Sequence, residues 1–228
     1  MRGILTAMRS SGPAPAPRTP RSAYFALAVL TFVNLFNYLD RYVVSGIVES
    51  LKPALHLSDA QAGSLMTGFI VVYMLASPVF GVLGDRGSRT RLVAAGVAVW
   101  SAATATAGLA TGFVMLFAAR AAVGIGEAAY GTIAPPLLAD SFPRKVRGRV
   151  FAVFFAAIPI GSALGYVLGG LVDRALGWRY AFYLAGLPGL ALAGLTLLVR
   201  DPPRGGEDER RGLLDLRVLL PTAQPKRK

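Results

Sequence analysis

Long stretches without a charged residue recur along the whole chain and limit what it can fold into. Asp, Glu, Lys and Arg are absent from five runs, at 22–39, 60–84, 92–119, 150–172 and 180–199. A helix that crosses the hydrocarbon core of a membrane needs about 20 apolar residues. The composition agrees, because 16% of the residues are charged and a soluble domain has about 25%. We therefore predict an all-α integral membrane protein.

The third run and the residues after it leave room for two crossings, with a tight turn at "ATGF", residues 110–113. Residues 1–22 are predicted to be a disordered cytoplasmic tail, and residues 201–228 a cytoplasmic linker or a truncated tail. The part between them, 23–200, is predicted to form one bundle of six transmembrane helices. These spans are 23–48, 60–84, 91–110, 113–139, 149–172 and 179–200.

The net charge of +12 would indicate nucleic-acid binding in a soluble protein. When the basic residues are placed on the predicted spans, however, they are distributed unequally between the two sides of the membrane. If the N-terminus is cytoplasmic, 19 basic residues lie on that side and three lie outside. This asymmetry is the positive-inside rule. We therefore predict a protein of the plasma (inner) membrane with both termini cytoplasmic, in contact with membrane lipids and without a nucleic-acid partner.

Few groups in the sequence could support catalysis. The chain has no Cys, which excludes thiolate metal sites, disulfides and thiol nucleophiles, and its single His, His56, falls in a predicted outer loop. The stretch "GIGEAA" at 124–129 fits a dinucleotide-binding pattern, but that pattern requires a preceding strand, and here it falls inside a predicted membrane helix. We predict no enzyme activity, no cofactor and no metal site.

Charged residues do occur inside two of the predicted spans. In "FNYLDRYVVS", residues 36–45, Asp40 and Arg41 stand side by side. At 100° per residue, a polar stripe about 100° wide runs along this helix, and Asp40 projects about 100° away from Arg41. Asp40 can therefore address a neighbouring helix. The residues of the stripe are Asn34, Asn37, Tyr38, Arg41 and Ser45.

The fourth predicted helix carries Arg120 and Glu127. They are seven residues apart, so they share a face and differ by about 10.5 Å in height. Asp40 and Arg120 each lie seven residues from the outer end of their helix, so Asp40 can pair with Arg120 or with Arg41. An ion at mid-bilayer costs at least about 2.5 to 3.5 kcal/mol. The four groups are predicted either to line a wet cavity as mutual pairs or to form an ion network that only orders the helices.

The loop after the second span has a recognisable pattern. The stretches "GVLGDRGSRTR" (81–91), "RAAVGIG" (120–126) and "FPRKVRGR" (142–149) resemble signatures of the major facilitator superfamily, whose secondary transporters consist of two six-helix halves. Gly81, Asp85, Arg86 and Arg89 match its loop pattern, and Ser88 replaces the usual glycine. The resemblance implies a conformational-switch loop. Because Asp85 follows a helix C-terminus, it needs basic neighbours or the start of another helix.

The fifth predicted span contains three glycines spaced four residues apart. Gly161, Gly165 and Gly169 form a smooth ridge that lets another helix approach closely. The pattern resembles one associated with antiporters, except that Tyr166 stands at its proline position. We interpret the ridge as a helix-packing surface.

Several longer stretches resemble the Spinster-like branch of this superfamily, known for exporting lysolipids and sphingoid phosphates. They are "NYLDRYVVSG" (37–46), "GIGEAAYGTIAPPLLAD" (124–140) and "AIPIGSALGY" (157–166). The resemblance implies a secondary active transporter with a lipid-like or lysolipid anionic substrate. An organic-anion and proton symporter of the same superfamily and a non-transporting membrane scaffold remain as alternatives.

The resemblance also implies roles for the polar residues. Substrate sites of such transporters lie near the midplane between the two halves. Glu127 is the first candidate for a proton carrier and Asp40 the second, since burial favours a neutral carboxyl and a nearby Arg favours an ionised one. The candidates for substrate binding are Asn34, Asn37, Tyr38, Arg41, Arg120 and Tyr130.

Six helices make one half of such a transporter. We therefore expect a missing C-terminal six-helix half or a second chain as a partner. The chain would then be a fragment, a truncated reading frame or half of a two-chain transporter.

Overall fold

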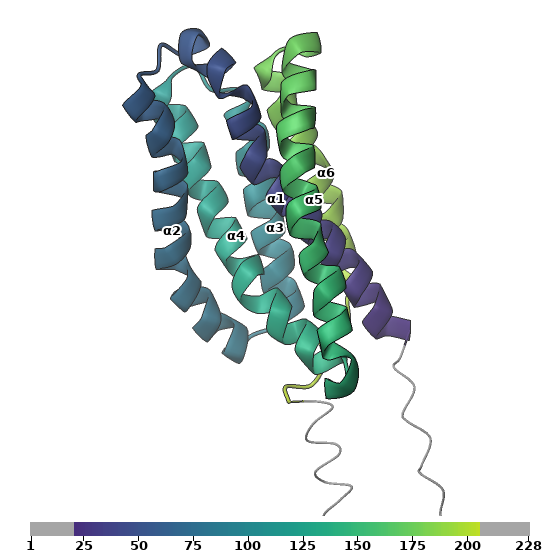
Figure 1. Cartoon of the computed structure of the whole chain (residues 1–228). Coiled ribbons are helices and arrows are strands. Elements are labelled where there is room, and N and C mark those ends of the chain that lie inside the picture. Colours follow the sequence, from purple (N-terminus) through teal and green to yellow (C-terminus); the bar gives the residue numbers. More distant parts are fainter. Residues whose placement is uncertain (1–20, 206–228) are drawn as a thin grey trace, which may run out of the picture.

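The computed structural model describes residues 21–205 and shows six helices that run alternately up and down in one bundle (Figure 1). The all-helical prediction is confirmed. Residues 1–20 of the predicted tail and 206–228 of the predicted linker lie outside the described residues. The helices are α1 (Arg21–Ala54), α2 (Asp59–Arg86), α3 (Arg89–Ala107), α4 (Phe113–Ser141), α5 (Arg144–Leu176) and α6 (Trp178–Leu197).

Each predicted span overlaps one helix, with differences at the ends. The first helix continues past the predicted residue 48 to Ala54, with Pro53 in its last turn. Five helices are long and apolar enough to cross a membrane, and α3 is the one described helix outside that group. Arg89 and Arg91 stand in its first turn and lower its mean hydropathy. In the bundle α3 packs against both α4 and α6, so much of its surface is covered by protein.

Local sequence signals explain where two of the helices begin. Ser58 forms a capping box with Gln61 before α2, in which each side chain bonds the backbone N–H of the other residue. Ser88, the residue that replaces a glycine of the loop pattern, caps α3 and accepts a hydrogen bond from the backbone N–H of Arg91 at 3.5 Å. The departure from the pattern therefore supplies the start of the third helix.

The helices α1 and α5 share the most extensive contact in the bundle, and their contact surface contains the predicted glycine ridge. A Cβ atom added at Gly161 would lie 2.5 Å from the carbonyl oxygen of Leu35, and one at Gly165 would lie 2.5 Å from that of Leu39. At Gly169 the corresponding distance, to the carbonyl oxygen of Val43, is 3.1 Å. No side chain fits between these backbones, so the glycines set how closely α5 approaches α1.

The helices α2 and α5 leave much of their apolar surface uncovered. In the most apolar part of α2, 11% of the residues are buried, against 50% in α4. Large apolar side chains are exposed on both helices, and they include Met74, Leu75, Val79, Val153 and Leu171. In water such surfaces would be unstable, so lipid or another protein segment must cover them.

The glycine ridge leads to a stability prediction. We expect Gly165→Leu to lower the free energy of unfolding by about 1 to 3 kcal/mol, because the new side chain would push α5 away from the α1 backbone. Gly194→Leu in α6 is the matched control, since a Cβ there meets no atom within 4 Å. The melting temperatures of the purified variants in detergent are the measurement. Equal melting temperatures for the two variants would contradict the packing role.

Candidate functional site

Four ionisable side chains from α1 and α4 meet inside the bundle as two ion pairs. Arg41 bonds Glu127 through its Nη2 atom and the Oε2 atom of the carboxylate. Arg120 Nη1 lies 3.5 Å from Asp40 Oδ2, at the outer limit of a hydrogen bond. The sequence left open which Arg pairs with Asp40, and the structure selects Arg120. We call these four residues the charge cluster.

A residue of α3 completes the environment of Asp40. The hydroxyl of Thr104 donates a hydrogen bond to Asp40 Oδ1 at 2.9 Å, and both residues are fully buried. The sequence analysis missed Thr104. The sequence shows only that hydroxyl and glycine residues interrupt the apolar run of this helix, and it does not show which helix they face.

Aromatic rings of α1 and α2 surround the two guanidinium groups. The Phe69 ring centre lies 4.9 Å from Arg41 Cζ and 5.4 Å from Arg120 Cζ. Arg41 also lies over the rings of Tyr38, at 4.8 Å, and Tyr73, at 5.8 Å. Such cation–π contacts are stronger away from water. Phe69 and Tyr73 were not predicted, because an aromatic residue in an apolar run carries no signal of its own.

The members of the charge cluster differ in accessibility. The Arg41 side chain is 23% exposed, whereas the Glu127, Asp40 and Arg120 side chains are 0 to 1% exposed. Within residues 21–205, several buried polar atoms near the cluster have no hydrogen-bond partner. They are Asn37 Nδ2, Arg41 Nε, Arg120 Nη2 and Glu127 Oε1. Leaving such a group unbonded costs about 1 to 3 kcal/mol, so the cluster is suited to receive further hydrogen bonds.

Two of the predicted substrate-binding residues serve as ties between helices. Asn34 Nδ2 donates to the carbonyl oxygen of Phe154 in α5 at 2.9 Å. The Tyr130 hydroxyl donates to the carbonyl oxygen of Leu30 in α1 at 2.8 Å. Both side chains are buried. Asn37 and Tyr38, by contrast, have no such tie in the described part of the chain.

The predicted conformational-switch loop is anchored by Arg89. Its side chain lies 2.6 Å from Asp140 Oδ2 at the end of α4 and 2.9 Å from Asp201 Oδ1 after α6, and it also bonds the carbonyl oxygen of Pro202. Arg204 donates to the carbonyl oxygens of Gly84 and Gly87, both at 2.9 Å. The segment after α6 is thus tied back to the α2–α3 loop.

The other residues of the loop pattern are less constrained. Asp85 and Arg86 are exposed, and Gly81 is in ordinary contact with Thr132. Asp85 has no ion-pair partner between residues 21 and 205. We expected basic neighbours or the start of another helix near Asp85. Arg89 is bonded to Asp140 and Asp201 instead, and α3 begins three residues after α2 ends.

A sequence profile of the major facilitator superfamily matches residues 30–225. The chain belongs to the major facilitator superfamily. It is a Spinster homologue within this family of transporters, which are not enzymes. Protein spinster of Drosophila melanogaster is 41% identical over 186 residues, which cover 81% of this chain and 31% of that protein. Human protein spinster homolog 1 is 41% identical over 209 residues, which cover 90% of this chain and 39% of that protein.

Solved structures of the family show the same arrangement of helices. A bacterial homologue of the human lysosomal transporter Spinster, in an inward-facing and occupied conformation, matches with a TM-score of 0.77 and 27% identity. The match covers 86% of this chain and 48% of that one. A D-xylose–proton symporter matches with a TM-score of 0.63 and 22% identity, which indicates a shared fold. The six helices correspond to the N-terminal half of the Spinster structure, and the chain spans about 40% of the length of its curated relatives.

The Asp40–Arg120 pair leads to a double-mutant prediction. We expect Asp40→Ala to lower the free energy of unfolding by about 3 to 5 kcal/mol, because it leaves Arg120 as a buried charge without a carboxylate. Asp40→Ala combined with Arg120→Met should restore most of this loss, since no lone charge remains. Unfolding in mixed detergent micelles is the measurement.

The exposed Lys52–Asp59 pair is the matched control for this cycle. Removing Asp59 alone should change stability little, because water already solvates both partners. If the double variant is as unstable as Asp40→Ala alone, the Asp40–Arg120 pair does not account for the loss.

Proposed function

We propose that this chain is the N-terminal half of a secondary active transporter that carries an anionic, lipid-like substrate by alternating access. The observation that supports the proposal most directly is the Arg41–Glu127 pair. It places a partly exposed cation on the polar stripe of α1, with a fully buried carboxylate behind it. A cation with one face open can receive an anionic head group without first leaving a buried position.

Arg41 is the proposed contact for the head group, together with Asn37 and Tyr38 from the same stripe. Its guanidinium offers several N–H donors in one plane, which suits a phosphate or carboxylate, and its Nε has no partner within the described residues. Arg120 is the second proposed cation. Asn34 and Tyr130 are assigned a supporting role, because their donors hold α1 in place.

An apolar cavity supports the lipid-like character of the substrate. It lies between α1 and α5, on the N-terminal side of Arg41 along α1, and has a volume of about 550 Å³. Its walls are almost entirely apolar and include Leu27, Phe32, Leu35, Val153 and Ile160. A hydrocarbon chain is the occupant whose transfer from water such walls favour. A small polar organic anion, the alternative substrate class, has no hydrocarbon chain whose transfer from water into this cavity would favour binding.

Proton coupling is proposed to arise from competition for Arg41. An anion that binds Arg41 draws it away from Glu127, and a buried carboxylate without its cation binds a proton more readily. Asp40 is the weaker candidate for a proton carrier, because its partners Arg120 and Thr104 are both fully buried, whereas Arg41, the partner of Glu127, is partly exposed to an incoming anion. The uptake of substrate and the uptake of a proton would then depend on each other.

Alternating access also requires a second half. A further six-helix bundle, in the same polypeptide or in another chain, is the proposed partner for the exposed apolar faces of α2 and α5. Asp85 is exposed beside the α2–α3 loop, where it could meet the end of a helix from that partner. The ties from Arg89 to Asp140 and Asp201 would hold the loop in place while Asp85 makes and breaks this contact.

The orientation is proposed from the charges at the two ends of the bundle. The end with the start of α1, the α2–α3 and α4–α5 connections and the end of α6 (Figure 1) carries ten of the described basic residues. The other end carries Lys52, Arg174 and Arg179. The basic end is proposed to face the cytoplasm, and the membrane to be the plasma (inner) membrane.

Single cysteines can test the orientation, because the chain has none of its own. A Cβ at Gly112, in the α3–α4 connection, or at Gly148, at the start of α5, meets no atom within 4 Å. We expect a membrane-impermeant maleimide to label Gly112→Cys in intact bacterial cells and Gly148→Cys only after permeabilisation. The opposite pattern would reverse the proposed orientation.

The transport proposal is tested in a complete transporter that contains this half. For one proton per substrate, a gradient of one pH unit supplies about 1.4 kcal/mol, which supports about tenfold accumulation. Glu127→Gln removes the proton site but keeps a neutral side chain of the same shape. We expect this variant to exchange substrate across proteoliposome membranes while its pH-driven accumulation falls to nearly equal concentrations.

Glu49→Gln is the matched control, because Glu49 is an exposed glutamate of α1. It should accumulate substrate as the unmodified protein does. Wild-type accumulation by Glu127→Gln would exclude Glu127 as the proton carrier. Transport of short organic anions but not of lysolipids would favour the symporter alternative, and no transport of either would favour a scaffold.

A further inference from the structure

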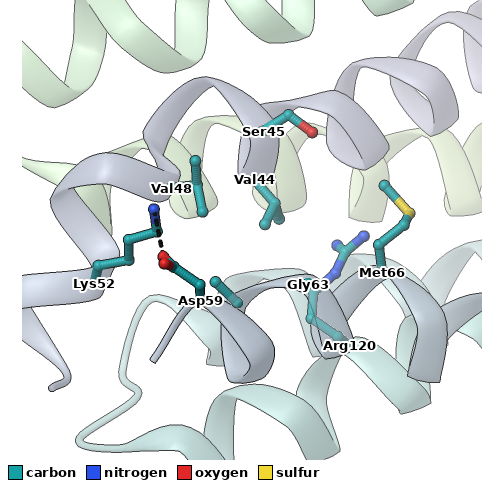
Figure 2. A pocket seen from close by; sticks show the side chains of 9 residues that line it. Val44, Ser45, Val48, Lys52, Asp59, Gly63, Met66 and Arg120 are labelled. Atoms are coloured by element: carbon teal, nitrogen blue, oxygen red, sulfur yellow. Dashed lines mark ion pairs between the residues drawn. The ribbon is translucent and has the colours of Figure 1, made fainter. Parts of the chain in front are cut away.

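A second cavity lies between α1 and α2, toward the end of the bundle that carries the α1–α2 connection (Figure 2). Its volume is about 510 Å³, which is within the range of small-molecule sites. It differs from the apolar cavity between α1 and α5 because charged residues stand at both of its ends. Arg120 lies at the inner end, and Lys52 and Asp59 lie at the outer end.

Arg120 lines this cavity and has an unused donor. The residue is 1% exposed, and while its Nη1 atom faces Asp40, its Nη2 atom has no hydrogen-bond partner in the described part of the chain. Figure 2 shows the guanidinium directed between Val44 and Met66. A buried guanidinium with a free N–H group favours an oxygen acceptor, and a charged acceptor more than a neutral one.

The outer end of the cavity is crossed by an ion pair. Lys52 Nζ, in the last turn of α1, lies 2.9 Å from Asp59 Oδ1 in the first turn of α2 and 2.9 Å from Glu49 Oε1. The Asp59 side chain is 91% exposed, so water competes for this contact. The pair can therefore open at little cost, which would leave Lys52 available to attract an anion.

The wall on the α2 side is shaped by a glycine. Gly63 lies in the interior of a helix, where glycine is less favourable than alanine, yet a Cβ at this position would meet no atom within 4 Å. Packing therefore does not require a glycine here. The missing side chain leaves room inside the cavity, whose other walls include the apolar side chains of Val44, Val48 and Met66.

We infer that the cavity between α1 and α2 binds a small amphiphilic anion, with its phosphate or carboxylate group on Arg120 Nη2 and a short apolar body against Val44, Val48 and Met66. The Lys52–Asp59 pair closes the outer end of the cavity and opens when the anion enters. Arg41 and Glu127 do not line this cavity, so the site shares only Arg120 with the proposed transport site. The inference rests on the proposed function only for the class of ligand.

Thiol protection in the purified chain tests the site without any transport step. Gly63→Cys and Gly112→Cys are placed separately in the cysteine-free chain, in phosphatidylcholine nanodiscs, and labelled with a water-soluble maleimide. We expect saturating hexyl phosphate to slow the labelling of Gly63→Cys at least about tenfold and to leave Gly112→Cys unchanged. Hexanol, which has the same apolar body without the charge, should protect neither position.

Inorganic phosphate separates a free anion from the head group of an amphiphile. Protection by hexyl phosphate at concentrations where inorganic phosphate has no effect would show that the apolar body contributes. Equal protection by both would show that the cavity selects the anion alone and would overturn the amphiphilic assignment. Equal protection by hexyl phosphate and hexanol, or protection of neither cysteine, would overturn the site.

A second test uses a variant whose new side chain fills the cavity between α1 and α2. Gly63→Leu occupies open space, so it should fold as the unmodified chain does, and it should weaken the binding of hexyl phosphate at least about tenfold in calorimetric titration. Gly194→Leu, the same change on α6 where a Cβ also meets nothing within 4 Å, should bind normally. Unchanged affinity in Gly63→Leu would contradict the inference. If a complete protein binds hexyl phosphate but transports no substrate, the inferred site stands and the transport proposal is rejected.

Discussion

The two ion pairs between α1 and α4 are the interaction on which the rest of the structure depends. A lone charge in the middle of a bilayer costs at least about 2.5 to 3.5 kcal/mol, and the bundle avoids this cost by pairing the four ionisable groups of the charge cluster. Each pair joins a residue of α1 to a residue of α4, although these two helices share little backbone contact. The long side chains of Arg41 and Arg120 therefore span a space that close helix packing would have removed. We propose that a ligand and a proton act in this space.

Close packing elsewhere makes this open centre possible. At Gly165 the backbone of α5 touches that of α1, and at Gly126 the backbone of α4 touches that of α3 near Gly96. These contacts hold the helices as rigid pairs. The cavities lie along α1, one toward α5 beyond the glycine ridge and one toward α2, where the two helices meet only loosely. The helices α1 and α4 are thus packed closely against α5 and α3, while α1 and α2 remain loosely packed beside the charge cluster.

The sequence does not show which partner a polar group finds in the folded chain. Asn34 and Tyr130 were grouped with the substrate-binding residues on the basis of residue type and resemblance, but their donors bond the backbones of neighbouring helices. Asp85 was expected to need basic neighbours or the start of another helix; Arg89 turns to Asp140 and Asp201, and α3 begins shortly after Asp85. Thr104 and Phe69 were missed because their roles depend on which helix lies opposite, and a single helix does not show this.

The sequence by itself determined the helical fold, the number of helices and the residues that carry charge into the membrane. These follow from local properties: the length of an apolar run, the angle of 100° between successive residues, and the cost of burying an ion. Only the tertiary structure decided that Asp40 pairs with Arg120 and Arg41 with Glu127, and that Arg120, with one donor unpaired, lines a cavity together with Gly63. The physical reason is that pairing depends on the rotation and height of one helix relative to another. Those are set by glycine contacts and side-chain packing that are summed over the whole bundle.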